Sequence, residues 1–276
     1  MGRRIAHGST SEVFEGVDGT VVKLLRNHVP SAWAEREAKI TEAVHGAGLP
    51  APAVLGLVMV DERPGIVFER IAGETMWDRM VDHPEETAQL AETLSELQSE
   101  INSTPSPYGL PHIVDRLAAN ILQAAVLTDD ERQTAMDRVG NLPKGSAVCH
   151  FDIHPKNVLL APDGPIAVDW FDAGSGDPAA DVVRSSLLMR PDMLSGHLDR
   201  SSPELVETLH ASYLRDVVGR RQVDPESILG WETVIAASRL AEPLTDDEIA
   251  VTLDTWRTAE GDGRSDLEIY LEAASI

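Results

Sequence analysis

The sequence is poor in cysteine and lacks long apolar runs, and each shortage argues against a class of protein. With a single cysteine among 276 residues, the chain cannot form an intrachain disulfide, which disfavours a disulfide-stapled secreted domain. It has no apolar run of about 18 residues, and no long apolar segment follows the basic pair Arg3-Arg4. We therefore expect neither a membrane span nor a signal peptide, and a cytoplasmic location.

Basic residues are scarce as well. The chain has 23 Lys and Arg against 46 Asp and Glu, which gives a net charge of −23. Residues 1–70 hold 9 acidic and 8 basic residues, so nearly all of the excess, 37 acidic against 15 basic, lies in residues 71–276. This charge disfavours nucleic acid and anionic membranes as partners and would attract a cationic substrate. Acidity that only keeps the chain soluble is an equal alternative.

A polar constellation is present in residues 149–181. His150, Asp152 and Asn157 follow the spacing H-x-D-x-x-x-x-N, and Asp169 lies twelve residues after Asn157. Kinase-type phosphoryl transfer needs one carboxylate that receives the proton of the acceptor hydroxyl, and an amide and a second carboxylate that hold magnesium on the nucleotide phosphates. This assigns Asp152 as the base, and Asn157 and Asp169 as metal ligands. The alternative is that these residues only form turns or cap helices.

Predicted strands around the constellation favour the catalytic interpretation. Residues 146–149, 158–161 and 166–168 are short apolar segments, and Pro162-Asp163-Gly164 marks a turn between the last two. The candidate base therefore follows one strand, the amide precedes the next, and the second carboxylate ends the third. This arrangement carries more weight than the spacing alone.

The string resembles the signature of the aminoglycoside phosphotransferase family of small-molecule kinases, H-G-D-x-H-P-x-N followed by D-W and G-D-P-x-x-D. It occurs here as residues 150–157, as Asp169-Trp170, and as Gly176-Asp177-Pro178 with Asp181. Phe151 stands where the pattern has Gly, which concerns the backbone freedom of the loop more than its chemical groups. Asp177 is expected to cap a helix, and Asp181 to hydrogen-bond the catalytic loop.

The resemblance implies an α+β, two-lobed protein-kinase-like fold. Residues 1–70 would form a small lobe made of an antiparallel sheet and one helix. Residues 71–276 would form a larger, mainly helical lobe that carries the catalytic loop and the acceptor site.

The first strands are expected to bind phosphate. Residues 4–26 are predicted to form three short strands. Gly8, Ser9 and Ser11 lie between the first two, where small residues let backbone N–H groups approach phosphates, although an ordinary turn explains a single glycine as well. Lys23 lies on the third strand, where a kinase lysine reaches the nucleotide phosphates; a solvated edge lysine is the alternative.

The segment that follows supplies a partner for that lysine. A helix is predicted over residues 31–47, with strands at residues 53–60 and 65–69. This helix offers Glu35, Glu37 and Glu42 as partners for Lys23, and the resemblance implies Glu37, through the pair Arg36-Glu37. The alternative is that all three glutamates solvate an exposed face. The resemblance also implies that backbone groups near Glu69 and Ile71, in the linker between the lobes, bind the adenine edge.

The later part of the chain is predicted to be mostly helical, with apolar residues at three- and four-residue spacing between Gly and Pro breaks. The predicted helices cover residues 75–81, 84–101, 111–127, 129–140, 179–189, 203–218, 225–240, 246–258 and 265–274. Asp172, Trp231 and Glu242 are candidates for the border of the acceptor pocket. A turn cap, core packing and a surface ion pair are the respective alternatives.

Taken together, the motifs predict a phosphotransferase that uses ATP, with GTP not excluded, and Mg²⁺. The acceptor would be a hydroxyl of a small cationic molecule such as an aminoglycoside, an amino sugar or an amino alcohol. A non-catalytic nucleotide-binding regulator is disfavoured because the base, metal ligands and lysine are intact. A protein kinase is disfavoured because the few residues between Asp172 and Gly176 leave little room for a long regulatory loop. The sequence leaves the acceptor and the oligomeric state open.

Overall fold

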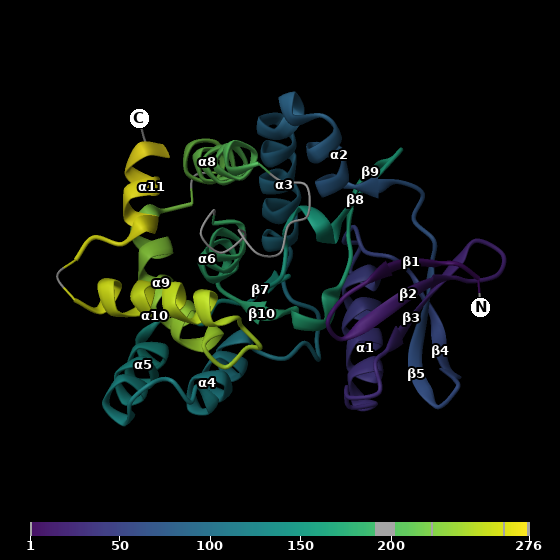
Figure 1. Ribbon diagram of the computed structural model, residues 1–276, viewed down its shortest axis with the longest axis horizontal. Coiled ribbons are helices and arrows are strands. Elements are labelled where there is room, and N and C mark those ends of the chain that lie inside the picture. The colour runs from purple at the N-terminus through teal and green to yellow at the C-terminus, as the bar shows by residue number, and fades with distance from the viewer. Residues whose placement is uncertain (1, 191–201, 222, 262, 275–276) are drawn as a thin grey trace.

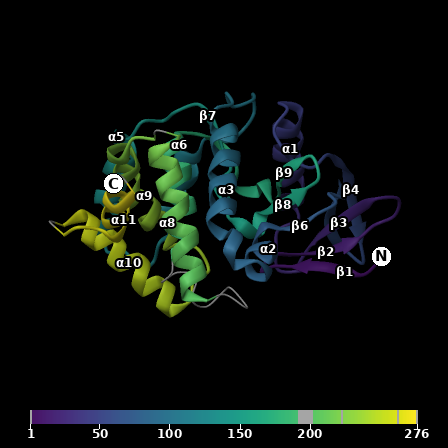
Figure 2. The same cartoon turned by 90° about the horizontal axis from the view of Figure 1, so that it is seen from above.

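The computed structural model describes residues 2–190, 202–221, 223–261 and 263–274 (Figure 1). Two lobes lie side by side along the long axis, with a sheet at one end and most of the helices at the other; the same separation is seen from above (Figure 2). This is the α+β, two-lobed arrangement that the sequence predicts. Among the described residues, no helix has the length and apolar character needed to cross a membrane.

The N-terminal lobe is a five-stranded antiparallel sheet in the order β1-β2-β3-β5-β4. Its strands are β1 (Arg4–His7), β2 (Ser11–Glu15), β3 (Thr20–Leu25), β4 (Val54–Val60) and β5 (Arg63–Glu69). Asp18 and Gly19 have φ angles of 50° and 75°, as the tight hairpin between β2 and β3 requires. Asp61 and Glu62 also have positive φ angles, and this tight reversal lets β5 begin at Arg63, earlier than predicted.

One helix, α1 (Ala32–Gly46), packs against β4 and β5 of this sheet. Its inward face carries Ala34, Glu37, Ala38 and Thr41, which are spaced three and four residues apart and are all buried. A glutamate within an otherwise uncharged stripe requires a cation opposite it, because burying an unpaired carboxylate is costly.

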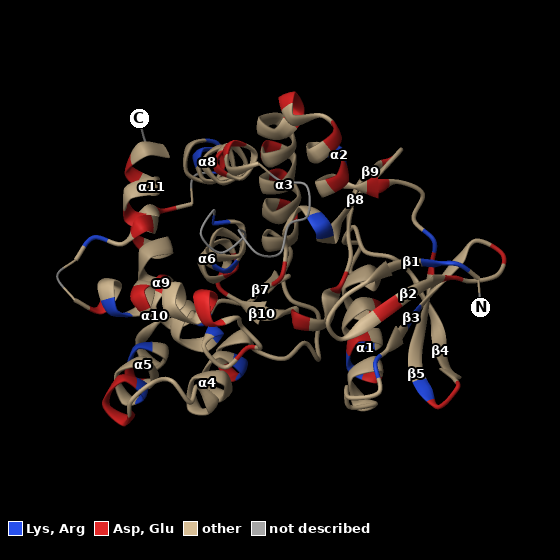
Figure 3. Ribbon diagram, viewed as in Figure 1, with Lys and Arg blue, Asp and Glu red and all other residues tan. Residues whose placement is uncertain are grey.

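The C-terminal lobe is built from helices around one continuous hydrophobic core. They are α2 (Met76–Asp82), α3 (Thr87–Asn102), α4 (Ile113–Gln123), α5 (Asp129–Asn141), α6 (Pro178–Met189), α8 (Pro203–Gly219), α9 (Pro225–Arg239), α10 (Asp246–Glu260) and α11 (Asp266–Ala274). The α9 helix packs against α4, α5, α6 and α10. Acidic residues are spread over α2, α5, α10 and α11 rather than gathered in one place (Figure 3).

Two small antiparallel sheets hold the segment that carries the polar motif. In one, β7 (Ala147–Cys149) pairs with β10 (Gly174–Gly176). In the other, β8 (Val158–Ala161) lies between β6 (Glu74–Thr75) and β9 (Gly164–Ala167). The short 3-10 helices η2 (Pro155–Asn157) and η3 (Trp170–Asp172) complete the segment.

Local sequence preferences missed β6 and β10, and placed the start of α4 two residues too early. Gly174 and Gly176 have little intrinsic preference for a strand, but a Cβ atom on either would collide with the Pro111–Ile113 segment. Pro111 is itself held by β10, because its carbonyl accepts a 2.8 Å hydrogen bond from the Ser175 N–H. The helix therefore begins only at Ile113.

Trp231 lies in the core of the C-terminal lobe, not at its surface. Only 1% of the residue is exposed, and it shares the buried face of α9 with Ile228 and Ile235. The three- and four-residue spacing of these residues explains the placement. Core packing, the alternative stated for Trp231, is the role that the structure supports, and Trp231 is not part of an acceptor-binding surface.

We expect Trp231→Ala to lower the free energy of unfolding by about 3–5 kcal/mol, because it empties a large volume in a closed core. Urea unfolding followed by circular dichroism measures this. Leu122→Ala, on the exposed face of α4, is the matched control and should change stability by less than ~0.5 kcal/mol. A Trp231→Ala variant as stable as the control would contradict the core assignment.

Candidate active site

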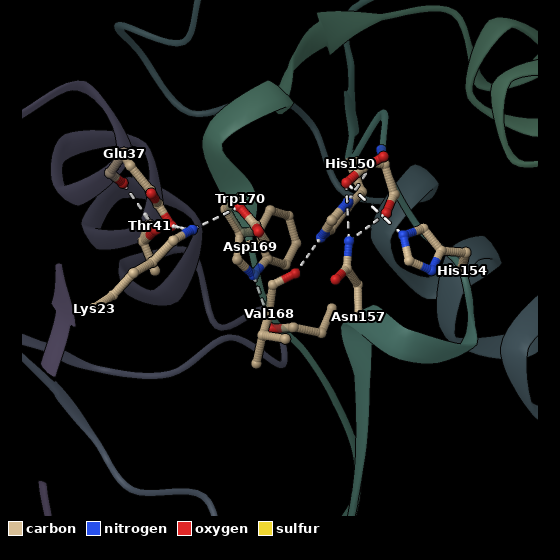
Figure 4. A network of polar contacts seen from close by, with 11 residues as sticks. Lys23, Glu37, Thr41, His150, His154, Asn157, Val168, Asp169 and Trp170 are labelled. Carbon is tan, nitrogen blue, oxygen red and sulfur yellow. Dashed lines mark hydrogen bonds and ion pairs between the residues drawn. The ribbon is translucent and has the colours of Figure 1, made fainter. Parts of the chain in front are cut away.

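The Lys23 ammonium group joins the two lobes (Figure 4). Lys23 projects from β3, and its Nζ donates hydrogen bonds to Glu37 Oε1 of α1 at 2.7 Å and to Asp169 Oδ1 at 2.8 Å. Asp169 belongs to the C-terminal lobe and directly precedes η3. The structure thus brings together three residues that the sequence singled out from separate segments.

Burial sets the electrostatics of this triad. Desolvation opposes the charge on Lys23, yet the carboxylates of Asp169 and Glu37 raise the pKa of the lysine above its ordinary value. Desolvation would also raise the pKa of Asp169, but the Lys23 ammonium keeps it below its ordinary value. Glu37 is 2% exposed, and its burial raises its pKa to about 7 despite the attraction of Lys23. Lys23 and Asp169 are therefore a charged pair at neutral pH.

Aromatic contacts hold α1 against η3. The rings of Trp33 and Phe171 lie 4.5 Å apart between centroids, and the Arg36 guanidinium lies 5.1 Å from the centre of the Phe171 ring. Phe171 is two residues beyond Asp169, so these contacts fix the helix that carries Glu37 relative to the segment that carries Asp169.

The catalytic loop is fastened by the buried carboxylate of Asp181, at the start of α6. Its Oδ1 accepts a 2.7 Å hydrogen bond from the Phe151 N–H, and its Oδ2 accepts from the His150 N–H at 3.3 Å and from Asn102 Nδ2 at 2.8 Å. Asp181 therefore binds the loop, as predicted. Asp177 caps α6 by accepting a 2.8 Å hydrogen bond from the Ala179 N–H, also as predicted.

Phe151 adopts a backbone conformation that favours glycine. Its φ angle is 65°, in the left-handed region where the family pattern has Gly. The ring is buried beneath the Arg116 guanidinium, which lies 5.0 Å from its centre. Tertiary contacts thus compensate for the strain, and the substitution leaves the glycine-type loop shape in place.

Asp152 and Asn157 face each other across this loop. The Asn157 amide donates 2.9 Å hydrogen bonds from Nδ2 to both the carbonyl oxygen and Oδ2 of Asp152. Asp152 Oδ1 accepts no hydrogen bond from any described residue. Desolvation, followed by the charge of Asp172, raises the pKa of Asp152 to about 8, although Arg184 acts in the opposite direction. Once deprotonated, such a carboxylate is a stronger base than an ordinary aspartate.

The two histidines of the motif are neutral and structural. His150 is buried, its Nε2 lies 3.1 Å from the Val168 carbonyl oxygen, and its Nδ1 accepts a 3.3 Å hydrogen bond from the Asp152 N–H. Its ring lies against Trp170 with centroids 4.5 Å apart. Burial lowers the pKa of His154 to about 4, so His154 is not a cation beside Asp152, 3.9 Å away.

The remaining phosphate and nucleotide candidates line the N-terminal lobe. Gly8 and Ser9 are exposed between β1 and β2, whereas Ser11 is buried as the first residue of β2. The Glu69 carboxylate accepts a 2.7 Å hydrogen bond from the Ala53 N–H, so its side chain is committed to the sheet. Ile71 lies half-buried in the linker, and its backbone N–H and carbonyl form no hydrogen bond to another described residue.

Asp172 and Glu242 lie near Asp152, each paired with an arginine that sequence reasoning missed. Arg116 binds Asp172 Oδ1 at 2.6 Å, and Arg184 binds both oxygens of Glu242 at 2.9 and 3.1 Å. Arg184 also donates a 3.3 Å hydrogen bond to the Phe151 carbonyl oxygen. Helical periodicity does not predict such arginines, because it does not distinguish an arginine in a buried ion pair from one on an exposed face.

We expect the effect of Asp152→Asn on stability to depend on pH. The folded pKa of Asp152, about 8, exceeds an unfolded value near ~4, so protonation of this carboxyl favours the folded state. That stabilisation is complete below pH ~4 and is lost as pH rises through about 8. Relative to the native chain, Asp152→Asn should gain about 4 kcal/mol between pH 5 and pH 9.

Urea unfolding at the two pH values measures this gain. Asp163→Asn, an exposed aspartate in the turn before β9, is the control and should show no pH-dependent gain. Equal behaviour of the two variants would contradict the raised pKa of Asp152.

Known proteins share this arrangement. Residues 2–225 match the Phosphotransferase enzyme family. An aminoglycoside 3'-phosphotransferase from Streptomyces fradiae is 29% identical over 142 residues, which cover 46% of this chain and 52% of the relative. The match thus spans about half the length of this curated relative.

Solved structures show the same fold. A thermostable mutant of aminoglycoside phosphotransferase APH(4)-Ia, in a ternary complex with AMP-PNP and hygromycin B, superposes with a TM-score of 0.63 at 17% identity, over 95% of this chain and 94% of that one. A choline/ethanolamine kinase family protein from Mesorhizobium loti gives a TM-score of 0.54 at 17% identity, over 99% of this chain and 91% of that one. Because the family model matches most of the chain, the chain belongs to the Phosphotransferase enzyme family.

Proposed function

We propose that this phosphotransferase moves the γ-phosphate of ATP, with Mg²⁺, to a hydroxyl of a small cationic molecule. The observation that carries the proposal is a polar network in which Lys23 binds Asp169 and Asn157 binds Asp152. His150 links the two pairs through the Asp152 N–H and the Val168 carbonyl oxygen (Figure 4). The solved relative bound to AMP-PNP, a nucleotide analogue, supports a nucleotide as the donor. The reaction needs ATP, which fits a cytoplasmic location.

The donor set fits a hard divalent cation. The Asn157 amide donates hydrogen bonds from Nδ2 to Asp152, and its Oδ1 accepts no hydrogen bond from a described residue. Lys23 occupies Oδ1 of Asp169, and the Asp169 side chain is 42% exposed, so its carboxylate is accessible. Oxygen atoms of an amide and a carboxylate are the ligands that Mg²⁺ prefers. When bound there, Mg²⁺ would neutralise charge on the nucleotide phosphates.

The residues of the chain divide the remaining work. Lys23, kept cationic and in place by Glu37, binds the phosphates as a point charge. The free Oδ1 of Asp152 orients the acceptor hydroxyl and takes its proton. The hydroxyl oxygen forms a bond to the γ-phosphorus while the bond from that phosphorus to the bridging oxygen breaks, which leaves ADP. Backbone groups at Gly8, Ser9 and Ser11 cover the phosphates. Backbone groups at Glu69 and Ile71 bind the nucleobase, the adenine of ATP or the guanine of GTP.

The acceptor assignment rests on charge and on the relatives. The chain carries a net charge of −23, and the acidic groups of the helical lobe attract an amine. Asp172 and Glu242 lie beside Asp152 and would face such a molecule. The named relatives act on aminoglycosides or belong to the choline/ethanolamine kinases, and both substrate classes carry amines and hydroxyl groups.

We expect Asp152→Ala to reduce kcat by about 10²- to 10⁴-fold, because it removes the group that accepts the proton. Phosphate transfer from ATP to a panel of aminoglycosides, amino sugars and amino alcohols, with and without Mg²⁺, is the measurement. Asp163→Ala is the control and should retain full turnover. Transfer to no member of the panel would refute the proposed acceptor class, and retained turnover in Asp152→Ala would refute the base.

A further inference from the structure

Arg239 is a buried cation without a partner. It ends α9, it is 4% exposed, and its Nε and Nη1 atoms are buried with no hydrogen-bond partner. No ion pair joins its guanidinium to a carboxylate within the described part of the chain. Every other arginine close to Asp152 is paired, Arg116 with Asp172 and Arg184 with Glu242. Arg239 differs from both, because two of its nitrogen atoms have no hydrogen-bond partner among the described residues.

The position of Arg239 points toward the acceptor side of the site. The helices that carry Arg116 and Arg184, α4 and α6, both pack against α9. The Glu242 N–H donates a 2.8 Å hydrogen bond to the Arg239 carbonyl oxygen, and the Glu242 carboxylate binds Arg184, which contacts Phe151 next to the base. The guanidinium also lies within electrostatic range of the Asp152 carboxylate. Arg239 therefore belongs to the surroundings of the hydroxyl that Asp152 would activate.

The charges that face Arg239 do not neutralise it by contact. Burial, followed by repulsion from Arg184, lowers the pKa of Arg239 to about 10, whereas Glu242, Glu248 and Asp152 raise it. Glu242 is bound to Arg184, and the Glu248 carboxylate accepts hydrogen bonds from Thr245 at the start of α10. Arginine does not give up its proton in a protein, so the charge persists at neutral pH.

A structural role at the end of the helix does not account for this arrangement. A cation in the last turn of α9 interacts favourably with the helix dipole, but an exposed side chain would gain that interaction without desolvation. Burying the guanidinium with two of its nitrogen atoms unbonded is costly in the free protein. An anion that binds there would offset this cost.

We propose that the acceptor carries an anionic group, a carboxylate or a phosphate, that pairs with Arg239 while Asp152 binds its hydroxyl. This inference rests on the proposed function and changes its acceptor from a purely cationic molecule to one that carries both an amine and an acid group. The acceptor would be a hydroxylated amine that also bears an acid group, in contrast to a purely polycationic aminoglycoside. A planar guanidinium suits either anion, because it donates two parallel hydrogen bonds.

Two matched pairs of acceptors test the proposal. Serine and ethanolamine differ by a carboxylate, and glucosamine 6-phosphate and glucosamine differ by a phosphate. The native protein should favour at least one anionic member in kcat/KM and in calorimetric affinity. Arg239→Met should lower that value by about 10- to 100-fold, the range for one lost charge-assisted hydrogen bond, and leave the other member unchanged. Arg239→Lys should retain part of the preference.

Stability separates a binding role from a structural one. Because Arg239→Met removes an unpaired buried charge, its melting temperature without ligand should equal or exceed that of the native protein. Arg257→Met, at an exposed ion pair with Glu131, is the control and should keep the acceptor preference. A marked loss of stability in Arg239→Met would indicate a structural role and overturn the inference.

The remaining outcomes are distinct from failure of the proposed function. If ethanolamine and glucosamine are phosphorylated as well as their anionic counterparts, the inference is overturned and the proposed function stands. If ATP phosphorylates none of the four, the wider panel still decides the proposed function, and calorimetry decides the inference. An affinity that does not differ within each pair, or that survives in Arg239→Met, overturns the inference.

Discussion

The buried ammonium group of Lys23 is the interaction on which the rest of the site depends. It lies between Glu37, on α1 of the sheet lobe, and Asp169, on the segment that leaves β9. The ammonium keeps the pKa of Asp169 below its ordinary value, and the two carboxylates raise the pKa of Lys23 against the effect of desolvation. The contact between Trp33 and Phe171 maintains the same spacing through packing. The same contacts of Lys23 thus set both the relative position of the two lobes and the charge state of the site.

The same carboxylate chemistry serves three purposes in different surroundings. Asp169, beside a lysine, has a lowered pKa and offers an anionic oxygen. Asp152, beside other carboxylates in a desolvated loop, has a raised pKa and accepts a proton near neutral pH. Asp181, enclosed by backbone N–H groups, holds the loop in shape. All three residues are aspartates, so their different roles follow from their different environments.

Much of this could be predicted from the sequence, and the omissions have physical causes. The motif residues and Lys23 were predictable because phosphoryl transfer restricts their types and the strands restrict their positions. Glu37 was chosen among three glutamates of one helix only through the family resemblance. The strand β10 was not predictable, since its glycines are selected by the close approach of Pro111 and Ile113. Trp231 and Arg239 lie on one helix, and periodicity alone does not distinguish a buried ring from a pocket wall or an unpaired arginine from a solvated one.

The central claim is that Lys23, Asp169 and Asn157 hold a magnesium nucleotide beside Asp152. Calorimetric titration with a non-hydrolysable ATP analogue, with and without Mg²⁺, tests it without any need to know the acceptor. The account predicts that Mg²⁺ strengthens binding to the native protein and that Asp169→Asn loses this strengthening while remaining folded. An affinity of the Asp169→Asn variant that responds to Mg²⁺ as the native protein does would contradict the account.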